Sequence, residues 1–165
     1  MFVLIPLDFH LWALVVFTIA ASTDWIDGYW ARRYGQVTKL GRIFDPFVDK
    51  IIICGAFIFL GAEPESGIAA WMAVVVVGRE LLVTALRSFI EERGADFSAT
   101  MSGKLKMLVQ CLAVGFSLYR LSYLPANEPP PWLSWSLIAL VWAAVVLTVY
   151  SGAGYVVAAV RLLRR

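Results

Sequence analysis

The chain has 165 residues, of which 61% are hydrophobic and 16% charged, and its formal net charge is +2. Soluble domains usually carry about 25% charged residues, so this composition excludes an ordinary soluble domain, a disordered chain and a collagen-like repeat. The net charge is too small and too scattered for nucleic-acid binding, and the apolar content indicates an integral membrane protein.

The apolar stretches predict the helices in chain order. A membrane-spanning helix needs roughly 20 mainly apolar residues, and five stretches separated by turn residues qualify: 9–31, 46–61, 67–90, 105–123 and 133–157. The second is short, so we expect Asp45 as its N-cap and Pro46 at its first helical position. The predicted fold class is an all-α integral membrane helix bundle, one domain over residues 1–165 with five spans.

Basic residues mark alternate connections between these stretches. The connections at 62–67 and 124–132 contain glutamates but no basic residue, whereas the other connections and the end of the chain hold Arg32, Arg33, Lys39, Arg42, Arg93, Lys104, Lys106, Arg161, Arg164 and Arg165. Because basic loops stay cytoplasmic, the pattern predicts an outside N-terminus. Residues 1–7 resemble the tail of a further apolar segment, so we expect six spans with a first helix missing here. The alternative is a true five-span protein.

Four aspartates gather around the first connection. Asp24 and Asp27 share one helix face at i, i+3, and Asp45 and Asp49 share another at i, i+4. Helices joined by a short connection are usually antiparallel neighbours, so these carboxylates could face one another. Carboxylates without nearby His or Cys favour Mg²⁺, Mn²⁺ or Ca²⁺, and paired ions assist phosphoryl displacement. The structural alternative is ion pairing with Arg32.

Small residues accompany the aspartates. Gly28 and Gly41 let a bulky ligand approach the backbone, and Ala31 is small for the same reason. The planar guanidinium of Arg32 suits a phosphate. The alternative is that the small residues only allow close helix packing.

The pattern Asp24-x2-Asp27-Gly28-x2-Ala31-Arg32-x8-Gly41-x3-Asp45-x3-Asp49 resembles the signature of the CDP-alcohol phosphotransferases at every fixed position. The family is a six-span, usually dimeric membrane fold that transfers a phosphoryl-linked group from a CDP-linked donor to an alcohol and releases CMP. The resemblance implies two Mg²⁺ or Mn²⁺ ions held by all four aspartates, with Asp49 also the base that acts on the acceptor hydroxyl. It implies a CDP site formed by Asp24, Asp27, Gly28, Ala31, Arg32, Gly41 and Asp45.

A second group of charges predicts the acceptor. Glu80, Thr84 and Arg87 share a helix face, and a cationic pocket could form from Arg79, Arg87, Lys104 and Lys106. Such a pocket suits an acceptor with its own phosphate, such as glycerol 3-phosphate or inositol phosphate, and suits serine less well. The alternative is an ion pair between Glu80 and Arg87, with the lysines marking only the inner surface.

The R-E-x6-R and G-K-x-K patterns and the stretch 147–152 resemble a bacterial subgroup of this family that makes phosphatidylglycerol phosphate, although Met107 stands where that subgroup commonly has Thr. The resemblance implies phosphatidyl transfer from CDP-diacylglycerol to glycerol 3-phosphate in a bacterial inner membrane, with the site facing the cytoplasm. The alternatives are another acceptor, cation transport through the bundle, or a non-catalytic relative.

The remaining polar and aromatic residues predict less. His10, the only histidine, lies near the predicted outer surface and away from the aspartates, where we interpret it as an interfacial residue. Gln110 is expected to bond to a neighbouring helix. Four tryptophans fit an aromatic belt at the outer surface: Trp12, Trp71, Trp132 and Trp135.

Overall fold

The computed structural model describes the backbone of residues 1–34, 39–92, 101–124 and 128–163, and within these ranges it describes side chains except at 24–34, 39–46, 49, 91–92, 101–102, 104 and 162–163. The described residues form five helices and no strand. The helices are α1 (His10–Tyr34), α2 (Lys39–Ala62), α3 (Ala70–Glu92), α4 (Met101–Tyr123) and α5 (Pro131–Leu163). The all-helical prediction is therefore confirmed.

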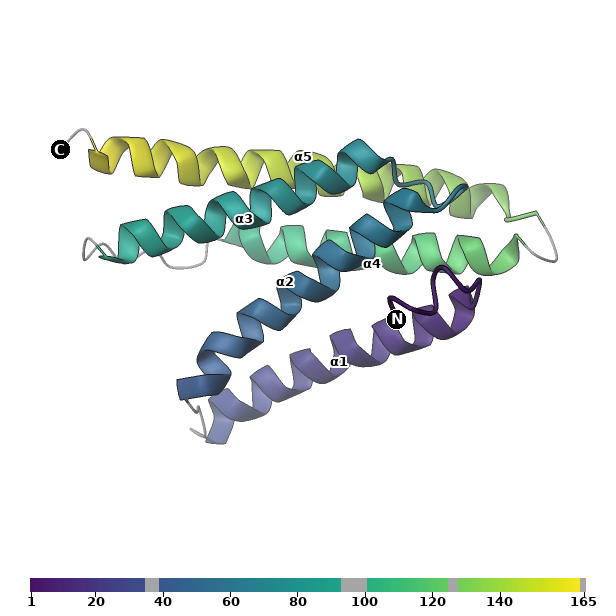
Figure 1. The fold of residues 1–165 in the computed structure, drawn as a ribbon, viewed down its shortest axis with the longest axis horizontal. Helices are drawn as coiled ribbons and strands as arrows, with labels where there is room; N and C mark the ends of the chain where they lie inside the picture. Colours follow the sequence, from purple (N-terminus) through teal and green to yellow (C-terminus); the bar gives the residue numbers. More distant parts are fainter. Residues whose placement is uncertain (35–38, 93–100, 125–127, 164–165) are drawn as a thin grey trace.

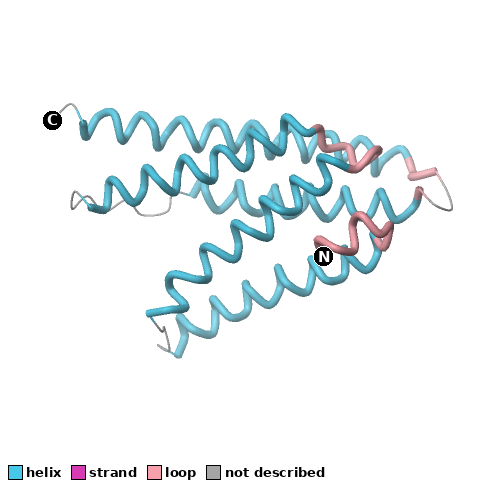
Figure 2. Tube along the Cα trace, viewed as in Figure 1, coloured by secondary structure: helices cyan, strands magenta, loops and turns pink. Residues whose placement is uncertain are grey.

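Successive helices run in opposite directions (Figure 1). Helix α4 packs against α5, α1 and α2, while α3 packs against α2 and α5. In the tube view, α1 and α2 diverge from α3 and α5 towards the end where α1 finishes and α2 begins (Figure 2). The alternation brings the helix ends that are flanked by basic residues to one end of the bundle, as the charge pattern predicts.

Apolar side chains from every helix form the core and also cover the outside. Buried members include Phe17 of α1, Phe57 of α2, Val76 of α3, Leu118 of α4 and Leu137 of α5. Large apolar side chains are exposed along the same helices, among them the four tryptophans expected at the aromatic belt. An outer surface this apolar is typical of a protein surrounded by lipid.

One helix in the described part of the chain is long and apolar enough to cross a membrane. It covers Pro131–Arg161, whereas His10–Thr23 and Lys50–Ala62 are shorter apolar helical stretches. The membrane crossings of α1 to α4 therefore stay predictions.

The start of α2 differs from the expectation. The helix begins at Lys39, so Asp45 is not its N-cap and Pro46 lies inside it. Residues 39–45 include three charged side chains, so a search for apolar stretches does not find this part of the helix. Proline removes one backbone donor from a helix, but membrane helices tolerate this where neighbouring groups satisfy the freed carbonyl.

The first nine residues fold back on the bundle as turns. The backbone N–H of Phe9 donates to the carbonyl of Leu4 at 3.0 Å, and the Phe2 ring stacks on Phe59 with centroids 5.5 Å apart. His10, where α1 begins, is only 6% exposed. These turns bury a ring that the sequence alone left exposed, and its place at the membrane interface stays a prediction.

Candidate active site

The backbone places the aspartates where α1 finishes and α2 begins, at the end where both helices diverge from α3 and α5 (Figure 2). Asp24 and Asp27 lie in the last part of α1, and Asp45 and Asp49 lie in the first part of α2. Both pairs are in continuous helix, so each keeps the spacing that puts two carboxylates on one face. Their side chains lie outside the described residues, as do those of the other predicted CDP-site and pocket members: Gly28, Ala31, Arg32, Gly41 and Lys104.

A buried charge cluster lies between α3 and α4. We use this name for Arg79, Glu80 and Lys106. Oε1 of Glu80 accepts hydrogen bonds from Nη1 of Arg79 at 3.1 Å and from Nζ of Lys106. All three side chains are less than a tenth exposed. The structure thus brings together two of the four predicted phosphate-binding cations.

Residues of helix α5 hold the side chain of Arg79 in place. Nη2 of Arg79 donates to Oγ of Ser151 at 2.9 Å, and Ser151 in turn donates to the carbonyl of Thr148 at 3.1 Å. The guanidinium centre lies 5.7 Å from the centroid of the Tyr155 ring, within the range of a cation–π interaction. Cγ of Arg79 would be 3.0 Å from a Cβ at Gly152, so a larger residue there would push against this stem.

The charge cluster is connected to the aspartate-bearing part of α2. Oγ1 of Thr84 donates to the backbone carbonyl of Glu80 at 2.6 Å, and Nζ of Lys50 donates to Oγ1 of Thr84 at 2.6 Å. Lys50 directly follows Asp49 in the chain. The network therefore reaches the helix turn that carries the predicted catalytic base.

The charges of the cluster do not balance. Among the described side chains, two cations face one carboxylate, and a buried charge is costly unless it is paired. Nε of Arg79 is buried and has no hydrogen-bond partner among the described residues. An anionic ligand at this point would supply both a counter-charge and an acceptor.

Arg87 occupies a different position from the cluster. It is half-buried on α3, eight residues beyond Arg79, which places it about 12 Å further along the helix. It lies towards the end where α3 finishes. The pairing of Glu80 with Arg87, the alternative to the pocket, stays a prediction.

Sequence reasoning missed most of the polar partners. It placed Ser151 in a family-like stretch but gave it no contact, and it assigned no role to Tyr155 or Lys50. Such contacts depend on how separate helices pack, which no local spacing encodes. The expected bond from Gln110 is confirmed, because its Nε2 donates to Oγ1 of Thr148 at 2.9 Å.

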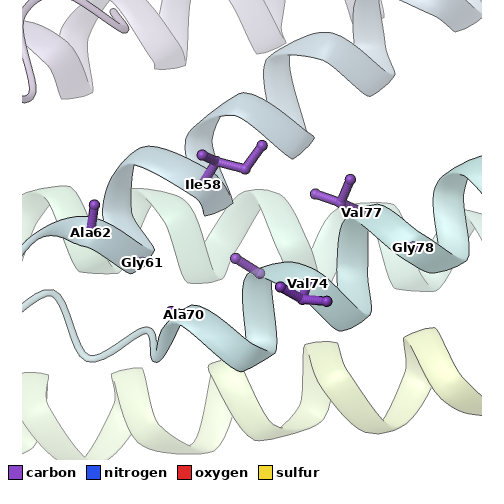
Figure 3. Close-up of a pocket in the computed structure, with 8 residues that line it drawn as sticks. Ile58, Gly61, Ala62, Ala70, Val74, Val77 and Gly78 are labelled. Carbon is purple, nitrogen blue, oxygen red and sulfur yellow. The ribbon is translucent and has the colours of Figure 1, made fainter.

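A separate pocket lies between α2 and α3 (Figure 3). Its volume is about 460 Å³, and glycines and apolar side chains line it: Ile58, Gly61, Ala62, Ala70, Ala73, Val74, Val77 and Gly78. It offers no side chain that could hold a phosphate or a metal ion.

Residues 1–150 match the family of CDP-alcohol phosphatidyltransferases, and the chain belongs to this family of transferase enzymes. It is 38% identical over 147 residues to the CDP-diacylglycerol–glycerol-3-phosphate 3-phosphatidyltransferase of Bacillus subtilis (strain 168), across 88% of this chain and 72% of the relative. The protein with the same name from Escherichia coli (strain K12) is 34% identical over 149 residues, across 89% of this chain and 78% of the relative.

Proposed function

We propose that this protein transfers a phosphatidyl group from CDP-diacylglycerol to glycerol 3-phosphate, giving phosphatidylglycerol phosphate and CMP. Family membership and the shared name of the relatives support the reaction. The observation that carries the choice of acceptor is the charge cluster. Among the described residues it has one more cation than carboxylate, and Nε of Arg79 has no hydrogen-bond partner. Inositol phosphate has the same kind of anionic group, so it remains the competing acceptor.

The four aspartates are the proposed ligands of two Mg²⁺ or Mn²⁺ ions. Their donor set fits these metals, because hard divalent cations prefer carboxylate oxygens, and both aspartate pairs keep a shared helix face. When bound, such ions neutralise the diphosphate of the donor and improve CMP as a leaving group.

The chain's own residues supply the base, the space for the nucleotide and a phosphate ligand. Asp49 takes the proton from the acceptor hydroxyl, because an alcohol is a weak nucleophile until a base acts on it. The hydroxyl oxygen bonds to the phosphatidyl phosphorus while the bond to the CMP oxygen breaks. Gly28, Ala31 and Gly41 leave space for the nucleotide, and Arg32 binds a phosphate.

The charge cluster holds the phosphate of the acceptor. Arg79 and Lys106 provide the donors, and Glu80 fixes both cations in one orientation. Arg87 and Lys104 extend the positive surface towards the end of the bundle. We place this end at the cytoplasmic face of a bacterial inner membrane, in a five-span domain that forms homodimers.

Release of CMP tests the reaction and its acceptor. The purified full chain in mixed micelles would receive CDP-diacylglycerol, Mg²⁺ and one of four additions: glycerol 3-phosphate, inositol phosphate, serine or no acceptor. We expect CMP only with glycerol 3-phosphate, and its complete loss after addition of EDTA. Release with a different acceptor would overturn the choice of acceptor, and release that persists in EDTA would overturn the metal requirement. No release with any acceptor would overturn the reaction.

A further inference from the structure

Three possible metal ligands meet at the end of the bundle away from the aspartates of the proposed active site. Asp8 lies in the N-terminal turns, His10 begins α1, and Glu63 follows the last residue of α2. One ligand atom from each residue lies within 4.8 Å of the other two. Nε2 of His10 is 4.0 Å from Oδ1 of Asp8. The fold thus gathers an imidazole and two carboxylates from two separate parts of the chain.

The imidazole of His10 is buried and makes no hydrogen bond to the described part of the chain. The residue is 6% exposed, and neither Nδ1 nor Nε2 has a partner among the described residues. Buried polar groups in proteins are nearly always satisfied, so each exception calls for an explanation such as an ion. An ion bound between this ring and the two carboxylates would satisfy one of its nitrogens.

The surrounding charge also favours a cation. No Lys or Arg occurs in residues 1–31 or 51–78, the two parts of the chain that supply these ligands. Arg120 reaches this end, but its Nη2 is 3.0 Å from Oε2 of Glu65, so that cation already has a carboxylate partner. A divalent ion would neutralise Asp8 and Glu63 together.

We propose that Asp8, His10 and Glu63 bind a divalent transition metal ion of the zinc class. Zinc takes imidazole nitrogen and carboxylate oxygen as ligands at about 2.0–2.2 Å, with water in the remaining position. This geometry brings ligand atoms to about 3.3 Å apart, closer than in the present structure. The 84% exposed side chain of Asp8 is free to close that gap by rotation.

This site is chemically and spatially distinct from the four aspartates. An oxygen-only set suits Mg²⁺ or Mn²⁺, whereas an imidazole ligand favours zinc and its neighbours. His10 also precedes Asp24 by 14 residues of α1, or about 21 Å of helix. The ion joins the start of α1 to the end of α2, so it stabilises the fold and takes no part in the reaction.

Zinc binding to the metal-stripped full chain tests the site. Excess Mg²⁺ would occupy the aspartates, and zinc retained per chain would be measured by mass spectrometry of the metal, together with the shift in thermal unfolding. We expect the unaltered protein to retain one more zinc ion than His10→Ala. Zinc should also raise the Tm of the unaltered protein but not that of His10→Ala, because a ligand stabilises the folded state that binds it.

The control and a second variant guard against misfolding. Glu128→Gln removes an exposed carboxylate from another connection, and it should bind zinc like the unaltered protein. Glu63→Gln replaces a half-buried ligand, so the fold should persist while the affinity for zinc falls at least about tenfold. Equal zinc retention and affinity in the unaltered protein, His10→Ala and Glu63→Gln would overturn the proposal.

Discussion

Arg79 owes its position to a glycine on another helix. Carbon atoms in normal contact lie about 3.5–4.0 Å apart, but a Cβ at Gly152 would be 3.0 Å from Cγ of Arg79. The arginine stem is also fixed by the bond to Ser151 and by the carboxylate of Glu80. A methyl group at residue 152 must therefore shift Arg79 within the proposed acceptor site.

Gly152→Ala should weaken acceptor binding more than donor binding. Loss of one well-placed hydrogen bond costs about 0.5–1.5 kcal/mol, so we expect the KM for glycerol 3-phosphate to rise roughly 3–10-fold while the KM for CDP-diacylglycerol stays unchanged. Gly154→Ala is the matched control, since a Cβ there meets nothing within 4 Å. Equal KM values for the two variants would contradict the role of Gly152.

Asp49→Asn tests the proposed base with a change of almost no volume. The amide cannot accept the proton of the acceptor hydroxyl, and a general base contributes about 100- to 10,000-fold to rate. We expect kcat for CMP release to fall by at least about 100-fold, with the helical circular dichroism unchanged. Glu128→Gln, which removes a distant exposed carboxylate, should keep full activity. Unchanged turnover of Asp49→Asn would assign the base elsewhere.

The sequence predicted the chemical role of these residues better than it predicted the residues they contact. Aspartate spacing is a property of a single helix, so it could be recognised without the fold. The cationic character of Arg79 and Lys106 was equally visible. Their shared partner Glu80 and the contact with Ser151 require three helices to be packed in register, and the sequence contains no local signal of that register.

Helices were predictable because each contains a long apolar stretch, but their ends were less so. Helix α2 begins at Lys39, well before its apolar part. A helix can continue through polar residues, so the apolar stretch alone does not mark where it starts.

The connection between α2 and α3 depends on a glycine. Gly67 has φ +76°, and a Cβ there would be 2.7 Å from Cδ2 of Leu137.

Gly67→Ala should therefore destabilise the fold. The left-handed backbone costs a residue with a Cβ about 1–2 kcal/mol, and the methyl group would also press against the buried Leu137. We expect the Tm of the detergent-solubilised protein to fall by about 2–8 °C. Gly78→Ala should not lower it, because a Cβ there meets nothing within 4 Å and alanine favours a helix. An unchanged Tm for Gly67→Ala would show that this connection relaxes freely.

At the scale of the whole molecule, the two ends of the helix bundle carry different kinds of residue. The aspartates and the basic helix ends lie towards one end, while the Asp8–His10–Glu63 group and four exposed tryptophans lie towards the other: Trp12, Trp71, Trp132 and Trp135. Apolar side chains cover the helices between them. This polarity was predictable from the alternation of basic and acidic connections. The divergence of α1 and α2 from α3 and α5 (Figure 1) was not, because no local pattern in the sequence encodes how whole helices are arranged.

Labelling of single cysteines tests this polarity in the membrane. Basic segments stay cytoplasmic, so in right-side-out spheroplasts an impermeant maleimide should modify Glu128→Cys directly and Arg161→Cys only after detergent is added. Both residues are exposed, and the half-buried Cys54 and Cys111 would first be replaced by alanine. The cysteine-free chain serves as the control, and retained CMP release would show that the fold persists. The reverse pattern would place the aspartates outside the cell, and direct labelling of both positions would contradict a membrane between the two ends.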